Sequence, residues 1–292
     1  MKLDKNTKIL IVGLGLIGGS YAMALSKKGY SVKCITKEQK DIDYALEKEI
    51  ITFGTTELDK DLIAESELVV FALYPTVFVE WIEKNQHLFS PGTIITDVTG
   101  VKGSVVNKIQ SVLRDDVEFI AAHPMAGRER SGVEYSDDKV FSGANYIVTP
   151  TDKNTGEAIE VAKRLGEELG FARISELTVE AHDEMIAFLS QLTHCIAVTL
   201  MTCNENDGLE KYTGDSFRDL TRIAKINDVM WSELFLMNKE ALLAQMDCFA
   251  EEFSKLRAYL ADGNREEMQK MMRFLFHFLE NKYLHLIYPC RS

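Results

Sequence analysis

The chain has 292 residues, enough for about two ordinary domains, and this length excludes a mini-protein that depends on disulfides to fold. A composition of 46% hydrophobic and 27% charged residues excludes a disordered chain. The net charge of −12 excludes a general attraction to nucleic acid or to an anionic membrane, so an anionic ligand must be held by a local cluster of cations.

The cysteines and the apolar runs point to a cytoplasmic protein. The five cysteines lie in neither CxxC nor zinc-ligand spacing, so we expect reduced thiols and no metal site. No stretch reaches the roughly 18 uninterrupted apolar residues of a membrane helix. The N-terminus imitates a signal peptide, but the glycines of its apolar run, Ile9–Gly19, fit a nucleotide-binding pattern better.

The first half of the chain alternates short apolar runs with helical stretches. Lys8–Val12 predicts a strand, a glycine-rich turn opens a helix that reaches Lys28, and Val32–Ile35 predicts the next strand. Further strands are expected at Leu68–Leu73, Thr93–Thr96, Phe119–Ala122 and Asn145–Thr149. Strands that alternate with helices favour a parallel, doubly wound sheet, so we expect an α/β Rossmann-type domain over residues 1–175.

The rest of the chain, residues 176–292, predicts an all-helical second domain. Six apolar residues from Leu242 to Leu260 follow a four-three spacing that places them on one helix face. Gly263 should end that helix, and Asn264 with Glu267 resembles a capping box that opens another. A partner subunit could cover this apolar surface, so we expect a homodimer joined through the helical domain.

The glycine-rich turn carries the clearest chemistry. It reads GxGxxG between a strand and a helix, the context that makes this pattern specific for a dinucleotide. Gly13 permits the tight turn, Gly15 lets the backbone approach the pyrophosphate, and Gly18 lets helix and strand pack closely. The residues expected to bind the cofactor are Gly13, Leu14, Gly15, Leu16, Ile17 and Gly18.

The end of the second predicted strand bears on the choice of cofactor. An acidic residue that bonds the adenosine ribose of NAD is expected there, and the chain has Thr36 followed by Lys37. Without the acid nothing repels a 2′-phosphate, and a lysine could pair with it. We therefore expect NAD(P) as cofactor, with NADP favoured slightly over NAD, since Thr36 could also bond a free hydroxyl.

Two loops that follow predicted strands supply candidate catalytic groups. Asp97–Lys102 follows one strand, and Ala122–Glu129 follows another, so both lie at the carboxyl edge of the sheet, where open α/β folds bind ligands. A histidine in that position, His123, is well placed to bond a reacting hydroxyl. The alternative is a structural, capping histidine.

The helical domain adds a second histidine and an arginine. Ser190 and His194, four residues apart, share a helix face distinct from the apolar stripe and could face a cleft. Asp219 and Arg222, three apart, can pair so that the guanidinium is held for a bidentate grip on a carboxylate. The alternatives are a structural histidine and a surface ion pair.

These motifs together resemble the prephenate dehydrogenase family, which includes arogenate dehydrogenases, over nearly the whole chain. The motifs that carry the resemblance are Gly13–Ser20, Asp97–Lys102, His123–Glu129, Ser190–His194 and Phe217–Ala224 with Met230 and Trp231. The resemblance implies NAD(P)-dependent oxidative decarboxylation of prephenate to 4-hydroxyphenylpyruvate in tyrosine biosynthesis.

The resemblance also implies roles for single residues. His123 would accept a hydrogen bond from the ring hydroxyl as it becomes a ketone, and His194 and Gln191 would help to hold the substrate. Arg222 would bind a substrate carboxylate, with Glu129 and Asp219 as a polar gate around it.

The chain departs from the family pattern in the first loop. The family usually has a serine where this chain has Gly100, so Thr99 is expected to supply the hydroxyl. Because prephenate is a dicarboxylate, Lys102, Arg128 or an arginine of a second subunit would hold the other carboxylate.

Three alternatives stay open at this point. Arogenate could replace prephenate as the substrate, because the two differ only in a keto or amino group on the side chain. Another β-hydroxyacid or imine dehydrogenase of the same plan is disfavoured by the Phe217–Ala224 run. A non-catalytic dinucleotide sensor is disfavoured by the presence of His123, His194 and Arg222 together.

Overall fold

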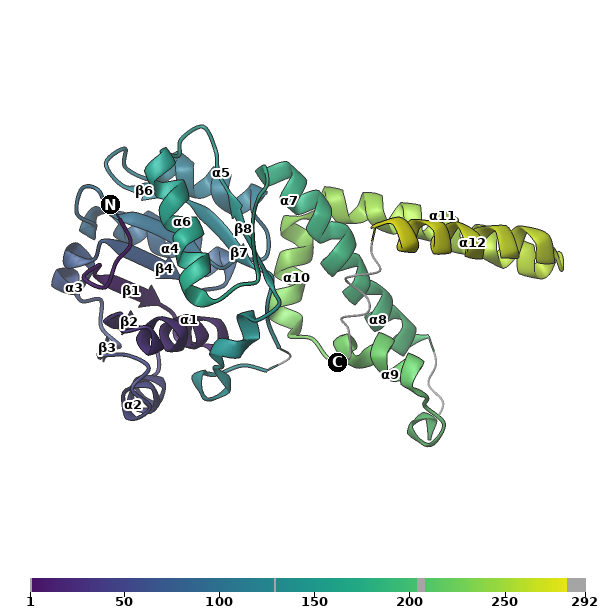
Figure 1. Cartoon of the computed structure of the whole chain (residues 1–292), viewed down its shortest axis with the longest axis horizontal. Helices are drawn as coiled ribbons and strands as arrows, with labels where there is room; N and C mark the ends of the chain where they lie inside the picture. The colour runs from purple at the N-terminus through teal and green to yellow at the C-terminus, as the bar shows by residue number, and fades with distance from the viewer. Residues whose placement is uncertain (1, 129, 204–207, 283–292) are drawn as a thin grey trace. The chain divides into compact units, whose positions relative to one another are not determined.

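The computed structural model describes residues 2–128, 130–203 and 208–282 (Figure 1). The chain divides into two compact units, Met1–Ala241 and Leu242–Ser292. The strands are β1 Ile9–Val12, β2 Val32–Ile35, β3 Phe53–Thr55, β4 Leu68–Phe71, β5 Ile94–Asp97, β6 Glu118–Phe119, β7 Ala121–Pro124, β8 Asn145–Thr149 and β9 Arg173–Glu176. The α-helices are α1 Leu16–Lys27, α2 Gln39–Glu47, α3 Lys60–Glu65, α4 Pro75–Asn85, α5 Gly103–Val112, α6 Gly156–Leu169, α7 Val179–Ile186, α8 Thr193–Thr202, α9 Asp215–Thr221, α10 Asp228–Met237, α11 Lys239–Ala261 and α12 Arg265–Lys282.

The first unit is built on a six-stranded parallel sheet in the order β3-β2-β1-β4-β5-β6, with helices on both faces (Figure 1). The central strands β1, β4 and β5 are buried on both sides, and their alternate residues face opposite layers. Ile9 and Ile11 pack with α1 and α6, whereas Leu10 and Val12 pack with α4 and α5. The predicted Rossmann-type α/β fold followed by helices is confirmed.

A second, three-stranded sheet differs from the prediction. The expected single strand Phe119–Ala122 is two strands, because after Phe119 the chain leaves the parallel sheet and pairs antiparallel with β8 as β7. Two strands were not predicted: β3 has three residues, and β9 is mostly polar and incompletely buried. The elements that follow Glu176 in the described part of the chain are helical. The predicted domain boundary at residue 175 stays a prediction.

One helical run, Val179–Thr202, is long and apolar enough by length and composition to cross a membrane. It comprises α7, a π-helical segment and α8. Length and composition alone are weak grounds, because the core helix of a globular protein passes the same test. This run contains buried His182, Asp183 and Gln191, which form hydrogen bonds inside the protein.

The second unit contains the apolar helix predicted to start near Leu242. The helix α11 ends before Gly263, whose φ of +64° suits a glycine, and Asn264 then accepts a hydrogen bond from the Glu267 N–H at 3.2 Å. Several of the predicted stripe residues are exposed, among them Phe253 at 62% and Leu260 at 68%.

Candidate active site

The glycine-rich loop between β1 and α1 forms an open backbone cradle. Gly13 has a φ of +97°, and a Cβ at Gly13 or at Gly18 would overlap a backbone carbonyl oxygen. A Cβ on Gly15, in contrast, would meet no atom within 4 Å. Within the described residues no side chain caps the first turn of α1. The loop therefore leaves helix N–H groups available to a phosphate, and it fits a dinucleotide.

The residues after β2 divide into a structural threonine and an exposed lysine. Thr36 is half-buried and its hydroxyl accepts a hydrogen bond from the Leu14 N–H at 3.3 Å, so it supports the glycine loop. Lys37 is exposed at the end of the same strand. This placement is compatible with contact to the adenosine end of a dinucleotide.

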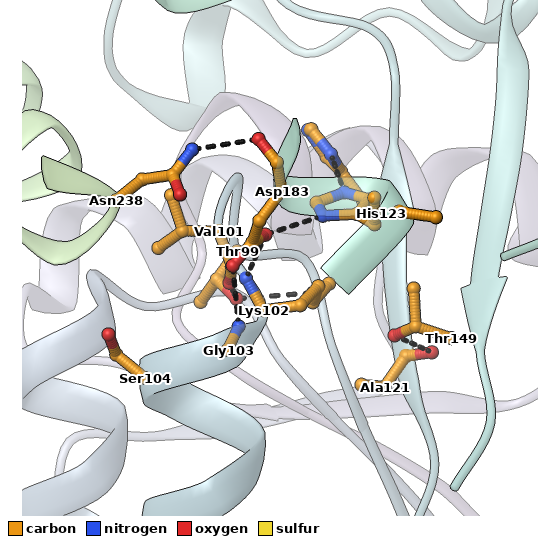
Figure 2. A network of polar contacts seen from close by, with 12 residues as sticks. Thr99, Val101, Lys102, Gly103, Ser104, Ala121, His123, Thr149, Asp183 and Asn238 are labelled. Carbon is orange, nitrogen blue, oxygen red and sulfur yellow. Dashed lines mark hydrogen bonds and ion pairs between the residues drawn. The ribbon is translucent and has the colours of Figure 1, made fainter. Parts of the chain in front are cut away.

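A buried polar network joins β5 to β7 (Figure 2). Lys102 is fully buried, and its Nζ donates to Asp97 Oδ2 at 2.7 Å, Thr99 Oγ1 at 3.1 Å and the Ala122 carbonyl at 2.6 Å. Asp97 Oδ1 accepts from the Ala122 N–H at 3.1 Å. Asp97 and Lys102 thus hold both backbone groups of the residue before His123, at the point where the chain passes between the two sheets.

This network bears on two predicted substrate contacts. All three ammonium donors of Lys102 are taken by protein oxygens, so Lys102 has none left for a substrate carboxylate. The Thr99 hydroxyl is buried and bonds Asp97 and the Val101 carbonyl, which argues against its replacing the family serine at the substrate. Both side chains instead fix the loop and strand that carry the site.

His123, at the carboxyl end of β7, belongs to a chain of three side chains. Its Nδ1 lies 2.9 Å from Nε2 of His182, and Nδ1 of His182 lies 2.7 Å from Oδ1 of Asp183. Figure 2 labels His123 and Asp183, the two ends of this chain. Asp183 also accepts the N–H groups of Lys102 at 2.8 Å and Gly103 at 2.7 Å, so its carboxylate anchors the start of α5.

The other ring nitrogen of His123, Nε2, faces Gly100, the position where the family usually has a serine. A Cβ built on Gly100 would lie 3.8 Å from Nε2 of His123 and 3.7 Å from Leu234 Cδ1. Burial, with His182 and Lys102 beside it, holds the pKa of His123 well below the ordinary 6.5. The ring is therefore neutral at physiological pH and can accept a proton.

The helix α10 packs over this edge of the first unit and links its parts. The Thr76 N–H donates to Glu233 at 2.6 Å, Asn227 bonds the Tyr74 hydroxyl at 3.1 Å, and Ser104 donates to the Met237 carbonyl at 2.9 Å. These contacts tie α10 to the N-terminal ends of α4 and α5.

Gln191, predicted to bind substrate, has a structural role instead. It is buried, donates to the Leu234 carbonyl at 2.9 Å and accepts from Asn238 at 2.8 Å. Asn238 also donates to the Asp183 carbonyl at 2.9 Å. The amide joins α10 to the helical run that carries His182, and substrate binding by Gln191 stays a prediction.

His194 lies on α8 against the same face of α10. Its Nδ1 donates to the Ser190 carbonyl at 2.9 Å, and its ring stacks on Trp231 with centroids 3.7 Å apart. Trp231 and Leu234 are three residues apart and therefore share a face of α10. A Cβ on Gly100 would lie within 4 Å of both Leu234 and Nε2 of His123, so both predicted histidines lie near this face of α10.

The structure does not pair Asp219 with Arg222 as the sequence predicted. Arg222 is exposed on a 3₁₀ turn, Arg222–Ala224, that packs against α8. Asp219 is exposed on α9, and the described residues show no ion pair between it and Arg222. The nearby ion pair joins Arg218 to Asp215 instead. Glu129, the third member of the predicted gate, lies outside the described residues.

His182 and Asp183 are site residues that the sequence analysis missed. The only local signal in the sequence is a histidine followed by an acidic residue on a predicted helix. This signal does not identify His123 as the partner of His182, because the two residues are 59 positions apart.

Comparison with known proteins identifies one family that matches both parts of the chain. The family model described as prephenate dehydrogenase, nucleotide-binding domain, matches residues 21–176, and the model described as prephenate dehydrogenase, dimerization domain, matches residues 178–274. A prephenate dehydrogenase of Bacillus subtilis is 30% identical over 272 residues, which are 89% of this chain and 72% of that protein. A cyclohexadienyl dehydrogenase of Zymomonas mobilis is 28% identical, over 94% of this chain and 93% of that protein.

Among solved structures, the chain is similar to a prephenate dehydrogenase from A. aeolicus in complex with hydroxyphenyl propionate and NAD+. The TM-score is 0.87 with 29% identity, over 96% of this chain and 99% of that one.

Proposed function

The chain belongs to the prephenate dehydrogenase family, whose members are oxidoreductases, and from this premise we propose that it catalyses the NAD(P)-dependent oxidative decarboxylation of prephenate to 4-hydroxyphenylpyruvate. The reaction would serve tyrosine biosynthesis. The observation that carries the proposal is the placement of His123 at the carboxyl end of β7, with its Nε2 directed toward Gly100.

The chemistry asks this chain for a base and for positioning. The bound dinucleotide would supply the hydride acceptor, and the loop Gly13–Gly18 would hold its pyrophosphate. As hydride leaves the ring carbon, the hydroxyl O–H bond breaks and its proton passes to Nε2 of His123. Loss of the ring carboxylate as CO₂ then makes the ring aromatic, so the enzyme mainly positions the substrate and accepts one proton.

The two substrate carboxylates need cations outside the buried network. We propose Arg222 for one of them, supported by its packing beside the helix of His194. Arg128, which pairs with Asp137 at 2.6 Å, or an arginine of a second subunit would serve the other. We do not propose Lys102, because its ammonium group already donates to protein oxygens.

The substrate is tested by kinetics with both ring compounds. Production of reduced nicotinamide is followed with prephenate and with arogenate, each with NAD and with NADP. The proposal expects the higher kcat/KM with prephenate. Turnover of arogenate alone would show that the protein is an arogenate dehydrogenase. Turnover of neither compound would favour a non-catalytic dinucleotide sensor.

A slight preference for NADP is the finer proposal for the cofactor. It is supported by exposed Lys37 and by the absence of an acid at Thr36. Thr36→Asp should shift kcat/KM toward NAD, because a carboxylate bonds the ribose hydroxyls and repels a 2′-phosphate. A wild type already strongly selective for NAD would refute this proposal.

A homodimer through the helical part is supported by the dimerization-domain match and by exposed Phe249 and Phe253 on α11. Light scattering after size-exclusion chromatography tests it. A monomer at micromolar concentration would contradict the proposal.

A further inference from the structure

We propose that His182, held by Asp183, is a positioning residue that fixes which ring nitrogen of His123 is free to take the substrate proton. The inference rests on the proposed function, in which His123 is the base. It goes beyond that function because it assigns a role to two residues that do not touch the substrate.

The hydrogen-bond chain permits only one arrangement of protons when both rings are neutral. An ionised carboxylate can only accept, so His182 donates to Asp183 from Nδ1. The Nε2 of neutral His182 is then an acceptor. His123 must therefore carry its proton on Nδ1 and donate it across the 2.9 Å contact.

This tautomer leaves the lone pair of His123 on Nε2, the atom that faces Gly100. With the opposite tautomer, Nε2 would carry a proton and could not accept another. The two protons thus belong to different nitrogens of the His123 ring. Nδ1 carries the proton donated to His182, and Nε2 receives the proton of the substrate hydroxyl.

The hydrogen-bond chain also leaves the His123 ring with an acceptor after it takes up the proton. When Nε2 of His123 accepts it, the ring becomes a cation whose Nδ1–H still donates to His182, with the Asp183 carboxylate behind it. The groups packed around the ring are His182 and Asp183 from α7, Lys102 from the start of α5 and Asp97 from β5. Lys102 pairs with Asp97 at 2.7 Å, and the Asp183 carboxylate accepts from His182 at the far end of the hydrogen-bond chain.

The position of His182 agrees with this role. Its side chain is fully buried, so its Nε2 has no water to replace His123 as a partner. The Asp183 carboxylate accepts the N–H groups of Lys102 and Gly103, and these contacts hold the last member of the hydrogen-bond chain in place. Substitution at Asp183 would also remove these helix contacts, which makes His182 the sharper place to test the proposal.

The test compares His182→Leu with His182→Gln. Leucine fills the space without an acceptor, whereas the glutamine amide oxygen can still accept from His123. We expect His182→Leu to lower kcat by about 10²-fold or more with substrate KM within about threefold, because the base is lost and binding is not. His182→Gln should recover at least about tenfold of that loss. His87→Leu, at an exposed histidine on a 3₁₀ turn, is the matched control and should keep wild-type kcat.

Two further measurements separate this role from a merely structural one. Nitrogen-15 spectra of histidine-labelled wild type should show His123 protonated on Nδ1, assigned by its loss in His123→Ala. In His182→Leu the acidic limb of kcat/KM should move away from its wild-type pH, because the His123 ring loses the neighbour that its Nδ1 contacts. Thermal unfolding and dinucleotide affinity confirm that the variants are folded.

The outcomes distinguish the two proposals. If His123→Ala keeps its kcat, the proposed base is wrong, whatever His182 does. If His123→Ala is inactive but His182→Leu keeps kcat within about twofold and the same pH profile, the base stands and the positioning role is refuted. Wild-type His123 protonated on Nε2, or equal losses in the Leu and Gln variants, would also overturn it.

Discussion

Replacing Lys102 with methionine tests whether this lysine holds the protein together or the substrate. The sequence suggested a carboxylate grip, whereas the structure places its ammonium at 0% exposure between Asp97, Thr99 and the Ala122 carbonyl. Methionine is close in length and apolar, so Lys102→Met removes the charge and three hydrogen bonds with little change in shape. Asp97 then keeps a buried negative charge without its cation.

The expected cost is large. Removing one member of a buried ion pair destabilises a protein by about 3–5 kcal/mol, mainly because the remaining charge is uncompensated. At about 2–4 °C per kcal/mol for a unit of this size, Tm should fall by roughly 6–20 °C. Since Asp97 and Lys102 hold the backbone of the residue before His123, kcat should fall in the folded variant while substrate KM changes little.

Thermal and urea unfolding measure the stability, and steady-state kinetics well below the lowered Tm measure kcat and KM. Lys108→Met is the matched control, because Lys108 pairs with Glu83 at 2.7 Å on the surface, where such pairs contribute at most about 1 kcal/mol. Asp97→Asn combined with Lys102→Met should cost less than the sum of the single changes. An unchanged Tm with substrate KM raised tenfold or more would refute the buried-pair reasoning and return Lys102 to the substrate.

Further predictions concern the site directly. His123→Ala should lower kcat roughly 10²–10⁴-fold with the dinucleotide Kd unchanged, and an unaltered kcat would make this histidine structural. Because the pKa of His123 lies below 6.5 and the neutral ring is the base, kcat/KM should stay level as pH falls to about 6.5 and be lost only below it; a limb above pH 7 would contradict this. Arg222→Ala should raise substrate KM roughly 30-fold to several hundred-fold, with Arg222→Lys restoring only part, whereas Arg218→Ala serves as a control; a KM within about twofold of wild type would exclude the grip. Gly100→Ser should fold normally, since its Cβ would meet only ordinary contacts at 3.7–3.8 Å, and one added hydrogen bond should lower substrate KM by about two- to tenfold; a KM that rises would show that the glycine makes needed space.

Local patterns in the sequence were sufficient for the nucleotide-binding half. The strand before Gly13 and the helix after it follow from apolar periodicity, and the parallel sheet follows from alternation of strands and helices. Strand β3 escaped because three residues give no periodicity, and β9 escaped because its residues are mostly polar.

Residue identity was also sufficient to select His123, His194 and Arg222 as candidates, but it could not tell a binding group from a structural one. Lys102, Thr99 and Gln191 were assigned to the substrate because their chemistry suits it. Their hydrogen-bonding partners are already inside the protein.

Only the tertiary structure decided those partners. The acceptors of Lys102 come from β5 and from Ala122, and the acceptor for His123 comes from a helix 59 residues away. The residue type fixes which donors and acceptors a side chain has. Their hydrogen-bond partners come from segments that meet only when the chain folds. The sequence by itself therefore determined the fold class and the candidate base, and the folded arrangement determined which polar groups remain available for chemistry.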